Sequence, residues 1–219
     1  MLATFKENLD EIENKVIKIG EGLIKSNELL LSALQDCDNK KFNEARSYIK
    51  NISTKTDDID NTIVKVLALY TPEARDLRKV VAYLKITNEL SRACSSTRSF
   101  IRGFMNVCED IDVETINEYA VPMQNSTVQA VKLTISMIKC EDEDEIQEIY
   151  NDVLIEENKT DDLYEMVERK LSLQADGSHT FEKFHRMLKA LRKSGKIATR
   201  AISIANLLVY AKIGGSIRS

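Results

Sequence analysis

The side chains best suited to chemistry in this sequence are basic residues and hydroxyls that recur along two stretches with helical periodicity. The first stretch holds five basic residues, namely Lys189, Arg192, Lys193, Lys196 and Arg200. The second holds hydroxyls and guanidinium groups, namely Ser91, Ser95, Arg98, Ser99 and Arg102. At about 100° per residue, each set falls on one side of a helix. Because guanidinium groups and hydroxyls bind oxyanions, the two sets indicate an anion site, a surface for an acidic partner, or two ordinary solvated helix faces.

Other potentially reactive groups lack the spacing of a catalytic or metal site. His179 and His185 have no Glu-x-x-His partner, which disfavours di-iron chemistry. The acidic run 141–145 contains no glycine, so it is better explained as a solvated turn and an acidic first helical turn than as a calcium loop. No Gly-x-x-x-x-Gly-Lys loop, Gly-x-Ser-x-Gly elbow or Cys-His nucleophile signature is present. We therefore expect a protein that is not an enzyme and that holds no cofactor.

Composition limits the class of protein further. The net charge of -4 argues against a nucleic-acid binder that works through overall positive charge. The sequence has no apolar stretch long enough to cross a membrane and does not begin like a signal peptide, so we expect a cytoplasmic protein without direct membrane insertion. The cysteines are scattered without CxxC spacing, and we expect them to be reduced and mostly packed; they are Cys37, Cys94, Cys108 and Cys140.

The elements that must position the two basic stretches are long helices. Only 7 glycines and 2 prolines interrupt the chain, and no alternating strand pattern is present. Apolar residues recur in steps of three and four from Phe5 to Leu23, and then without a break from Phe42 to Tyr70. Thr71-Pro72-Glu73 closes this second helix and opens a third, which should run to about Met105. Its buried face is expected to begin with Leu77, Val80, Leu84 and Thr87.

The second half of the chain repeats this pattern after an acidic segment. We interpret 109–118 as a linker with a short helical start, and Pro122 as the entry to the fourth helix. The fifth helix carries an apolar face from Ile146 to Val167. After a loop at 175–178, the sixth carries one whose members are Phe181, Phe184, Leu188, Leu191, Ala198, Ile202, Ala205 and Val209. Gly214-Gly215 should end it.

An internal repeat supports the count of six helices. Lys55-Thr56-Asp57-Asp58 recurs as Lys159-Thr160-Asp161-Asp162, 104 residues later, in the middle helix of each triplet. The sequence therefore predicts an all-α fold of two tandem three-helix bundles, with a first repeat over 1–108 and a second over 109–219. The alternative is one irregular bundle in which the matching tetrapeptides are accidental.

One segment resembles a known family. The stretch 67–80, Leu-Ala-Leu-Tyr-Thr-Pro-Glu-Ala-Arg-Asp-Leu-Arg-Lys-Val, is similar to the Pro-x-Ala-Arg-Asp-Leu-Arg run of the PhoU family, with Pro72, Arg75, Asp76 and Arg78 carrying the match. The stretches 84–92 and 190–196 also resemble family segments. The resemblance implies a fold of six long helices built as a spectrin-type repeat.

The family's metal-binding pattern is not matched. Members of the family hold transition-metal ions on Glu-x-x-x-Asp pairs, and here the aligned positions are Ser91 with Ser95 and Arg192 with Lys196. The companion positions are Thr56 with Asp60 and Thr160 with Tyr164. Hydroxyls and cations cannot replace hard anionic ligands, so we predict that the usual metal site is absent. One hypothesis is that an anion or acidic-partner surface has replaced it, and the other is that these positions are ordinary solvated helix faces.

The resemblance implies a negative regulator of phosphate uptake and phosphate-starvation signalling. Such a protein acts as an adaptor between the ATPase subunit of a phosphate ABC transporter and a sensor histidine kinase, and often forms a homodimer. Two alternatives remain open at this point. One is an accessory protein of a different transporter, and the other is a general helical scaffold or chaperone-like binding protein.

Overall fold

The computed structural model describes residues 2–173 and 179–215, and within these ranges every regular element is helical. The predicted all-α fold class is confirmed. The elements are α1 (Leu2–Asp36), α2 (Asn39–Tyr48), α3 (Ile52–Leu69), α4 (Ala74–Met105), η1 (Cys108–Asp110), α5 (Val113–Thr115), η2 (Ile116–Ala120), α6 (Val121–Ser136), α7 (Glu143–Leu173) and α8 (His179–Lys212). None of the described helices combines the length and the apolar character needed to span a membrane.

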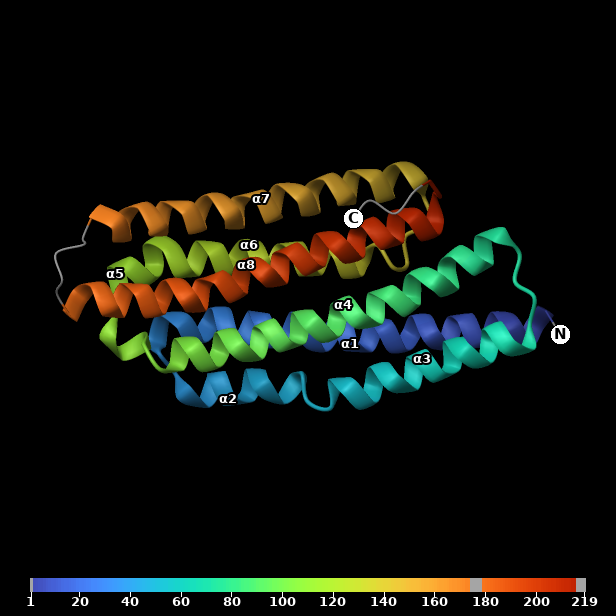
Figure 1. Cartoon of the computed structure of the whole chain (residues 1–219), viewed down its shortest axis with the longest axis horizontal. Coiled ribbons are helices and arrows are strands. Elements are labelled where there is room, and N and C mark those ends of the chain that lie inside the picture. The colour runs from blue at the N-terminus through green and yellow to red at the C-terminus, as the bar shows by residue number, and fades with distance from the viewer. Residues whose placement is uncertain (1, 174–178, 216–219) are drawn as a thin grey trace.

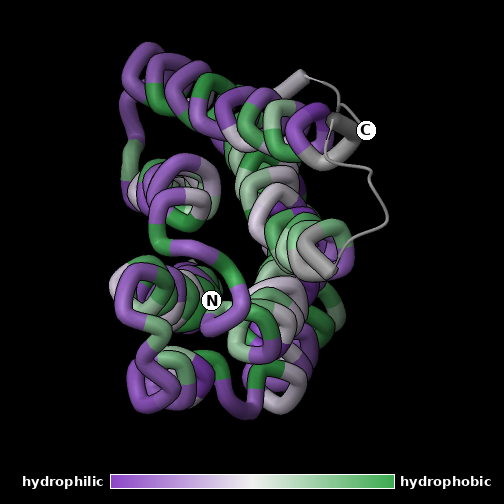
Figure 2. Tube along the Cα trace, turned by 90° about the vertical axis from the view of Figure 1, so that its left-hand side faces the viewer, coloured by the Kyte–Doolittle hydropathy of each residue, from purple (hydrophilic) through white to green (hydrophobic). Residues whose placement is uncertain are grey.

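The helices run along one long axis and form two three-helix units that lie against each other (Figure 1). The first unit contains α1, α2 with α3, and α4; the second contains α6, α7 and α8. The units meet where α4 packs extensively on α8 and where α1 packs on α6. Hydrophilic and hydrophobic residues are interspersed along the helices (Figure 2).

The second helix is broken, which corrects the prediction of an uninterrupted helix from Phe42 to Tyr70. Asn51 adopts a left-handed conformation with φ 55°, between the end of α2 and the start of α3. At Gly22 of α1 an added Cβ would lie 2.8 Å from the Tyr48 carbonyl oxygen, so the end of α2 packs closely against α1. The apolar spacing hides the break because Ile49 and Ile52 are both buried, one on each side of it.

The acidic segment 109–118 is more than a linker. Ile111, Ile116 and Tyr119 are buried, and the chain is helical from Val113 onward. A π-helical stretch, η2, precedes Pro122 in the first turn of α6. Proline has no amide hydrogen for the normal helical bond, and a wider turn before it accommodates that loss.

The buried face of α4 differs from the predicted one. Leu77 and Leu84 are 42% and 39% exposed, whereas Val80 and Thr87 are buried as expected. Helix α4 contacts α1 and α3 as well as α8. Its buried residues therefore occupy more than one face of the helix, whereas the prediction placed them on a single face. On α8, Phe181 is likewise 38% exposed, and it stacks on His185. The predicted loop at 175–178 and the side chain of His179 lie outside the described residues.

Two cysteines form a disulfide, so the prediction of reduced thiols is wrong for this pair. Cys37 follows α1, Cys108 begins η1, and their Cα atoms are 5.7 Å apart although 71 residues separate them in the chain. Cys94 is a free, buried thiol and Cys140 a free, half-buried one. Burial raises the pKa of the Cys94 thiol to about 12, although the charges of Arg98 and Lys55 act against it.

The apolar core consists of two clusters that follow one another along the bundle. One cluster includes Leu23, Cys94 and Ile197, and the other includes Leu30, Phe100 and Leu191. Both clusters contain residues of both chain halves. The core is therefore divided across the long axis, and each half depends on the other for its burial.

A buried polar layer lies where the helices pass from one cluster to the other. The Gln124 amide donates to the Asn27 carbonyl oxygen and side-chain oxygen at 3.2 and 3.0 Å. Asn27 donates to the Thr97 hydroxyl at 3.3 Å, and Ser194 donates to the Gln124 oxygen at 2.8 Å. Each half contributes one amide and one hydroxyl to these bonds, and the buried Thr127 of the second half is also bonded to Ser194, at 2.9 Å. The side chains of Asn27, Thr97, Gln124 and Ser194 are fully buried, and they supply hydrogen-bond partners to one another. These bonds fix how the two units meet.

Candidate functional site

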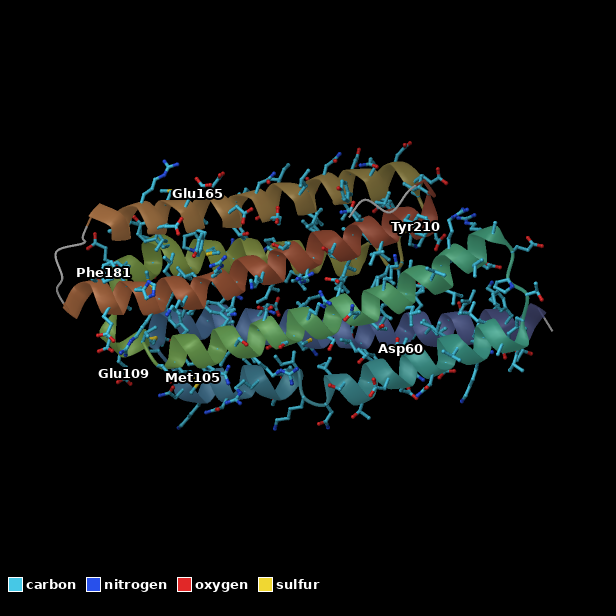
Figure 3. All side chains as sticks on the ribbon, in the orientation of Figure 1. Asp60, Met105, Glu109, Glu165, Phe181 and Tyr210 are labelled. Atoms are coloured by element: carbon cyan, nitrogen blue, oxygen red, sulfur yellow. A yellow bond between two sulfur atoms is a disulfide. The ribbon has the colours of Figure 1, made fainter. Side chains whose placement is uncertain are left out.

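In the first half, the positions aligned with the family's metal ligands lie on α3 and α4 and are rich in hydroxyls. Thr56 is buried and donates to the carbonyl oxygens of its own helix. Asp60, labelled in Figure 3, accepts a hydrogen bond from the buried Thr87 hydroxyl at 2.7 Å. Ser91 is half-buried and Ser95 is exposed. One carboxylate that is already hydrogen-bonded, together with neutral hydroxyls, does not fit a transition-metal cluster.

In the second half, the corresponding positions lie on α7 and α8, where acids of α7 stand beside the basic residues of α8. Thr160 is buried, and the positive charge of Arg192 acts on Tyr164, whose pKa is nevertheless raised by burial. Glu157 accepts a hydrogen bond from Thr199 of α8 at 3.2 Å. Burial raises the pKa of Glu157, and the negative charge of Asp161 adds to that rise. Within the described residues, no group of three His, Cys, Asp or Glu side chains could hold a metal ion, and the absence of metal stays a prediction.

The structure brings some of the predicted basic residues together in one cavity. A cavity of about 460 Å³ lies between the end of α4 and the beginning of α8, near Met105 and Phe181 in Figure 3. Its lining residues are Ser99, Arg102, Gly103, Asn106, Val107, Arg186, Lys189, Ala190 and Lys193. Three predicted cations, Arg102, Lys189 and Lys193, therefore meet here. We call this space the basic cavity.

The remaining predicted cations lie elsewhere. Arg192 and Lys196 are exposed on α8 outside the basic cavity. Arg200 forms an ion pair with Glu89 of α4 at 3.0 Å, which neutralises much of its charge. Arg98 lies close enough to Cys94 to act on its thiol and does not line the cavity.

Sequence reasoning missed Arg186, Asn106 and Gly103. Arg186 precedes Lys189 and Lys193 by three and seven residues, so helical spacing alone could have added it to the basic stripe. No sequence signal marks Asn106. Gly103 matters because an added Cβ would lie 3.3 Å from the Ala190 Cβ, which indicates that α4 and α8 approach closely at the cavity.

The residues of the family motif lie at the opposite end of the bundle from the basic cavity, where α4 begins (Figure 1). Asp76 lines a second cavity of about 430 Å³ with Phe5, Glu13 and other residues of α1 and α4. Arg78 packs beside Gly214, and Pro72 lies in the turn before α4. Burial opposes ionisation of Glu141, yet its pKa is lowered by Lys212, with Lys79 and Arg75 contributing. The motif thus helps to join the two units.

Comparisons with known proteins agree with this architecture. The PhoU domain family matches residues 16–100. A phosphate-specific transport system accessory protein PhoU homolog of Pseudomonas aeruginosa is 22% identical over 226 residues, covering 98% of this chain and 87% of that protein. An uncharacterized protein of Methanocaldococcus jannaschii, MJ1011, is 32% identical over 101 residues, covering 44% of this chain and 76% of that protein.

Solved structures share the fold over nearly the whole chain. The crystal structure of PhoU from Pseudomonas aeruginosa has a TM-score of 0.84 at 20% identity and covers 96% of this chain and 100% of that chain. The phosphate transport system regulatory protein PhoU from Streptococcus pneumoniae has a TM-score of 0.82 at 16% identity, covering 98% and 99%. Fold and helix order define an all-α protein of two tandem three-helix bundles. The chain belongs to the PhoU family.

Proposed function

We propose that this protein is a non-enzymatic accessory regulator of phosphate transport, and that it represses phosphate uptake and phosphate-starvation signalling. The observation that carries the proposal is the likeness along 98% of the chain to a phosphate-specific transport accessory protein. PhoU proteins are regulatory accessory proteins, and the described residues contain no group of His, Cys, Asp or Glu side chains that could hold a catalytic metal ion. Fold alone would not support a role, because one fold hosts many functions.

The proposed partners are the ATPase subunit of a phosphate ABC transporter and a sensor histidine kinase. An adaptor can shift a kinase toward its non-signalling state only if it binds that state more tightly than the signalling state. Rigid helices with fixed polar faces suit such discrimination, because they present the same surface before and after binding. The proposal includes a homodimer, supported by apolar residues exposed on α3 such as Val64 and Leu69, at 60% and 71%.

We assign partner contact to Arg192 and Lys196. Both are exposed on α8, and neither forms an ion pair with another residue of the described chain. They also lie outside the basic cavity. Exposed basic side chains at an interface rim favour an acidic partner surface and accelerate association.

The experiment measures binding of the purified protein to the transporter ATPase subunit and to the cytoplasmic part of the kinase by biolayer interferometry. The test variant is Arg192→Glu with Lys196→Glu. Its control is Lys18→Glu with Lys65→Glu, which makes the same charge change at exposed positions of α1 and α3. We expect the test variant to weaken binding to one or both partners at least about tenfold, mainly through a slower association rate.

Two results would contradict the proposal. If the native protein binds neither the ATPase subunit nor the kinase, the assigned partners are wrong. If both double variants bind as well as the native protein, the basic stripe is an ordinary solvated face and does not contact the partner.

A further inference from the structure

The basic cavity has the composition of an anion site. Four of its nine lining residues are cationic, and none is acidic. Arg102, Lys189 and Lys193 form no ion pair with another described residue, whereas Arg186 pairs with Glu182 one turn earlier on α8. Cations that have no acidic partner in the chain and surround one hollow create a positive local potential, which attracts anions. We propose that the basic cavity binds a linear condensed phosphate, a chain of two or more phosphate groups.

The spacing of the cations favours a chain over a single phosphate. Arg186, Lys189 and Lys193 extend about 10 Å along α8, at 1.5 Å rise per residue. Arg102 approaches from α4, on the other wall of the cavity. A single phosphate group could contact the first and last of these cations together only if both side chains bent toward each other along the helix. A phosphate chain can contact all four, and guanidinium groups can bind its oxygens in pairs.

The close approach of the two helices shapes the site. Gly103 and Ala190 are the small residues at which α4 and α8 meet, and an added Cβ on Gly103 would lie 3.3 Å from that of Ala190. Larger residues here would separate the walls and move Arg102 away from Lys189 and Lys193. Ser99 and Asn106 add neutral donors beside the cations.

The residues that line the basic cavity also indicate whether its ligand carries a nucleobase. It contains no aromatic side chain, and its apolar members are Val107, Ala190 and Gly103. Nucleobases bind proteins largely by stacking on aromatic side chains or guanidinium planes. A volume of about 460 Å³ falls in the range of small-molecule sites. The cavity therefore fits a phosphate chain, and only the guanidinium planes of Arg102 and Arg186 could stack on an attached nucleobase.

This inference goes beyond the proposed function and does not depend on it, because it rests on the cavity alone. Arg192 and Lys196, which carry the partner proposal, do not line the cavity. A failed partner experiment would leave anion binding intact, and failed anion binding would leave the regulator proposal intact.

The experiment is titration calorimetry of the full chain with sodium tripolyphosphate, pyrophosphate, orthophosphate and ATP, without divalent metal, at two salt concentrations. We expect affinity to fall from tripolyphosphate to pyrophosphate to orthophosphate, and ATP to bind no more tightly than tripolyphosphate. Lys189→Glu with Lys193→Glu should weaken tripolyphosphate binding at least about tenfold, since it removes two charge-assisted contacts. Lys18→Glu with Lys65→Glu should change it less than about twofold at 0.15 M salt, where distant charges are screened.

Arg102→Ala is the second test, because it removes one cation without placing a negative charge in the cavity. It should also weaken tripolyphosphate binding while circular dichroism and the melting temperature stay close to those of the native protein. If orthophosphate binds as tightly as tripolyphosphate, the ligand is not a phosphate chain and this part of the proposal is wrong. Equal losses in both double variants, or no tripolyphosphate binding at low salt, would overturn the site itself.

Discussion

The middle element of the first unit is a pair of helices, α2 and α3, whereas that of the second unit is the single helix α7. The ends of the units are also fastened differently. In the first, the Cys37–Cys108 disulfide ties the end of α1 to η1. In the second, the buried Lys212 ammonium donates to the Cys140 carbonyl oxygen at 2.6 Å and holds the turn before α7. The same three-helix plan can therefore be kept with quite different local constraints, provided that the units still meet correctly.

Removal of the Cys37–Cys108 disulfide should have the largest effect on stability. Cys37→Ser with Cys108→Ser should lower the free energy of unfolding by up to about 4 kcal/mol, because the bond closes a loop of 71 residues. The melting temperature should fall by roughly 10 °C. Cys140→Ser, at a free and half-buried thiol, is the matched control and should change little. Thiol titration of the oxidised, denatured protein should find two reactive groups, and four would show that the disulfide is absent.

A substitution in the buried polar layer tests whether hydrogen bonds across the two units stabilise the fold. Gln124→Leu leaves the buried Asn27 side-chain oxygen without its donor and leaves Ser194 with Thr127 alone, and should cost about 2 to 3 kcal/mol in urea unfolding. The same change at Gln129, half-buried on the same helix, should cost well under 1 kcal/mol, roughly the value of an ordinary surface change.

A double variant sharpens this result. Asn27→Leu with Gln124→Leu removes both amides, so its cost should be smaller than the sum of the two single changes. Additive costs would mean that the two amides do not act as a pair across the units.

Sequence reasoning anticipated this architecture unevenly, for identifiable reasons. The helices and the end of α4 at Met105 follow from apolar spacing, which depends on local geometry. The break at Asn51 escaped notice because buried residues continue across it. The disulfide escaped because its partners meet only in the folded chain. Among the cavity cations, Arg102, Lys189 and Lys193 were predicted, while the contribution of Gly103 depends on how closely α4 and α8 approach.

The break between α2 and α3 can be tested against the continuous α7 by a reciprocal pair of substitutions. Asn51 is left-handed, and the repeat offset aligns it with Ile155, an exposed residue inside α7. At Asn51, alanine should be less stable than glycine by about 1 kcal/mol, because a Cβ disfavours the left-handed region. At Ile155 the order should reverse by a similar ~1 kcal/mol, since glycine weakens a helix interior. Urea unfolding of the four variants measures both differences, and the same order at both positions would contradict the broken helix.

The smallest effect concerns the acids beside the basic stripe of α8. Burial raises the pKa of Asp161 in the folded state, and the charges of Asp162 and Glu165 raise it further. A raised folded pKa favours folding only at low pH, and this advantage is lost as the pH rises from the ordinary value of 3.8 through the folded value. At pH 7 the ionised carboxylate therefore costs stability.

Asp161→Asn should accordingly stabilise the protein at pH 7 by no more than about 0.5 kcal/mol, because solvent screens this partly exposed side chain. The gain should shrink as the pH is lowered toward 4, as measured by urea unfolding at each pH. Asp57→Asn, at the aligned exposed position of α3, controls for the loss of one negative charge. A gain of the same size and pH dependence at Asp57 would mean that the surroundings of Asp57 and Asp161 are electrostatically alike. A gain confined to Asp161 would locate the difference between the units in the packing of α7 against α8.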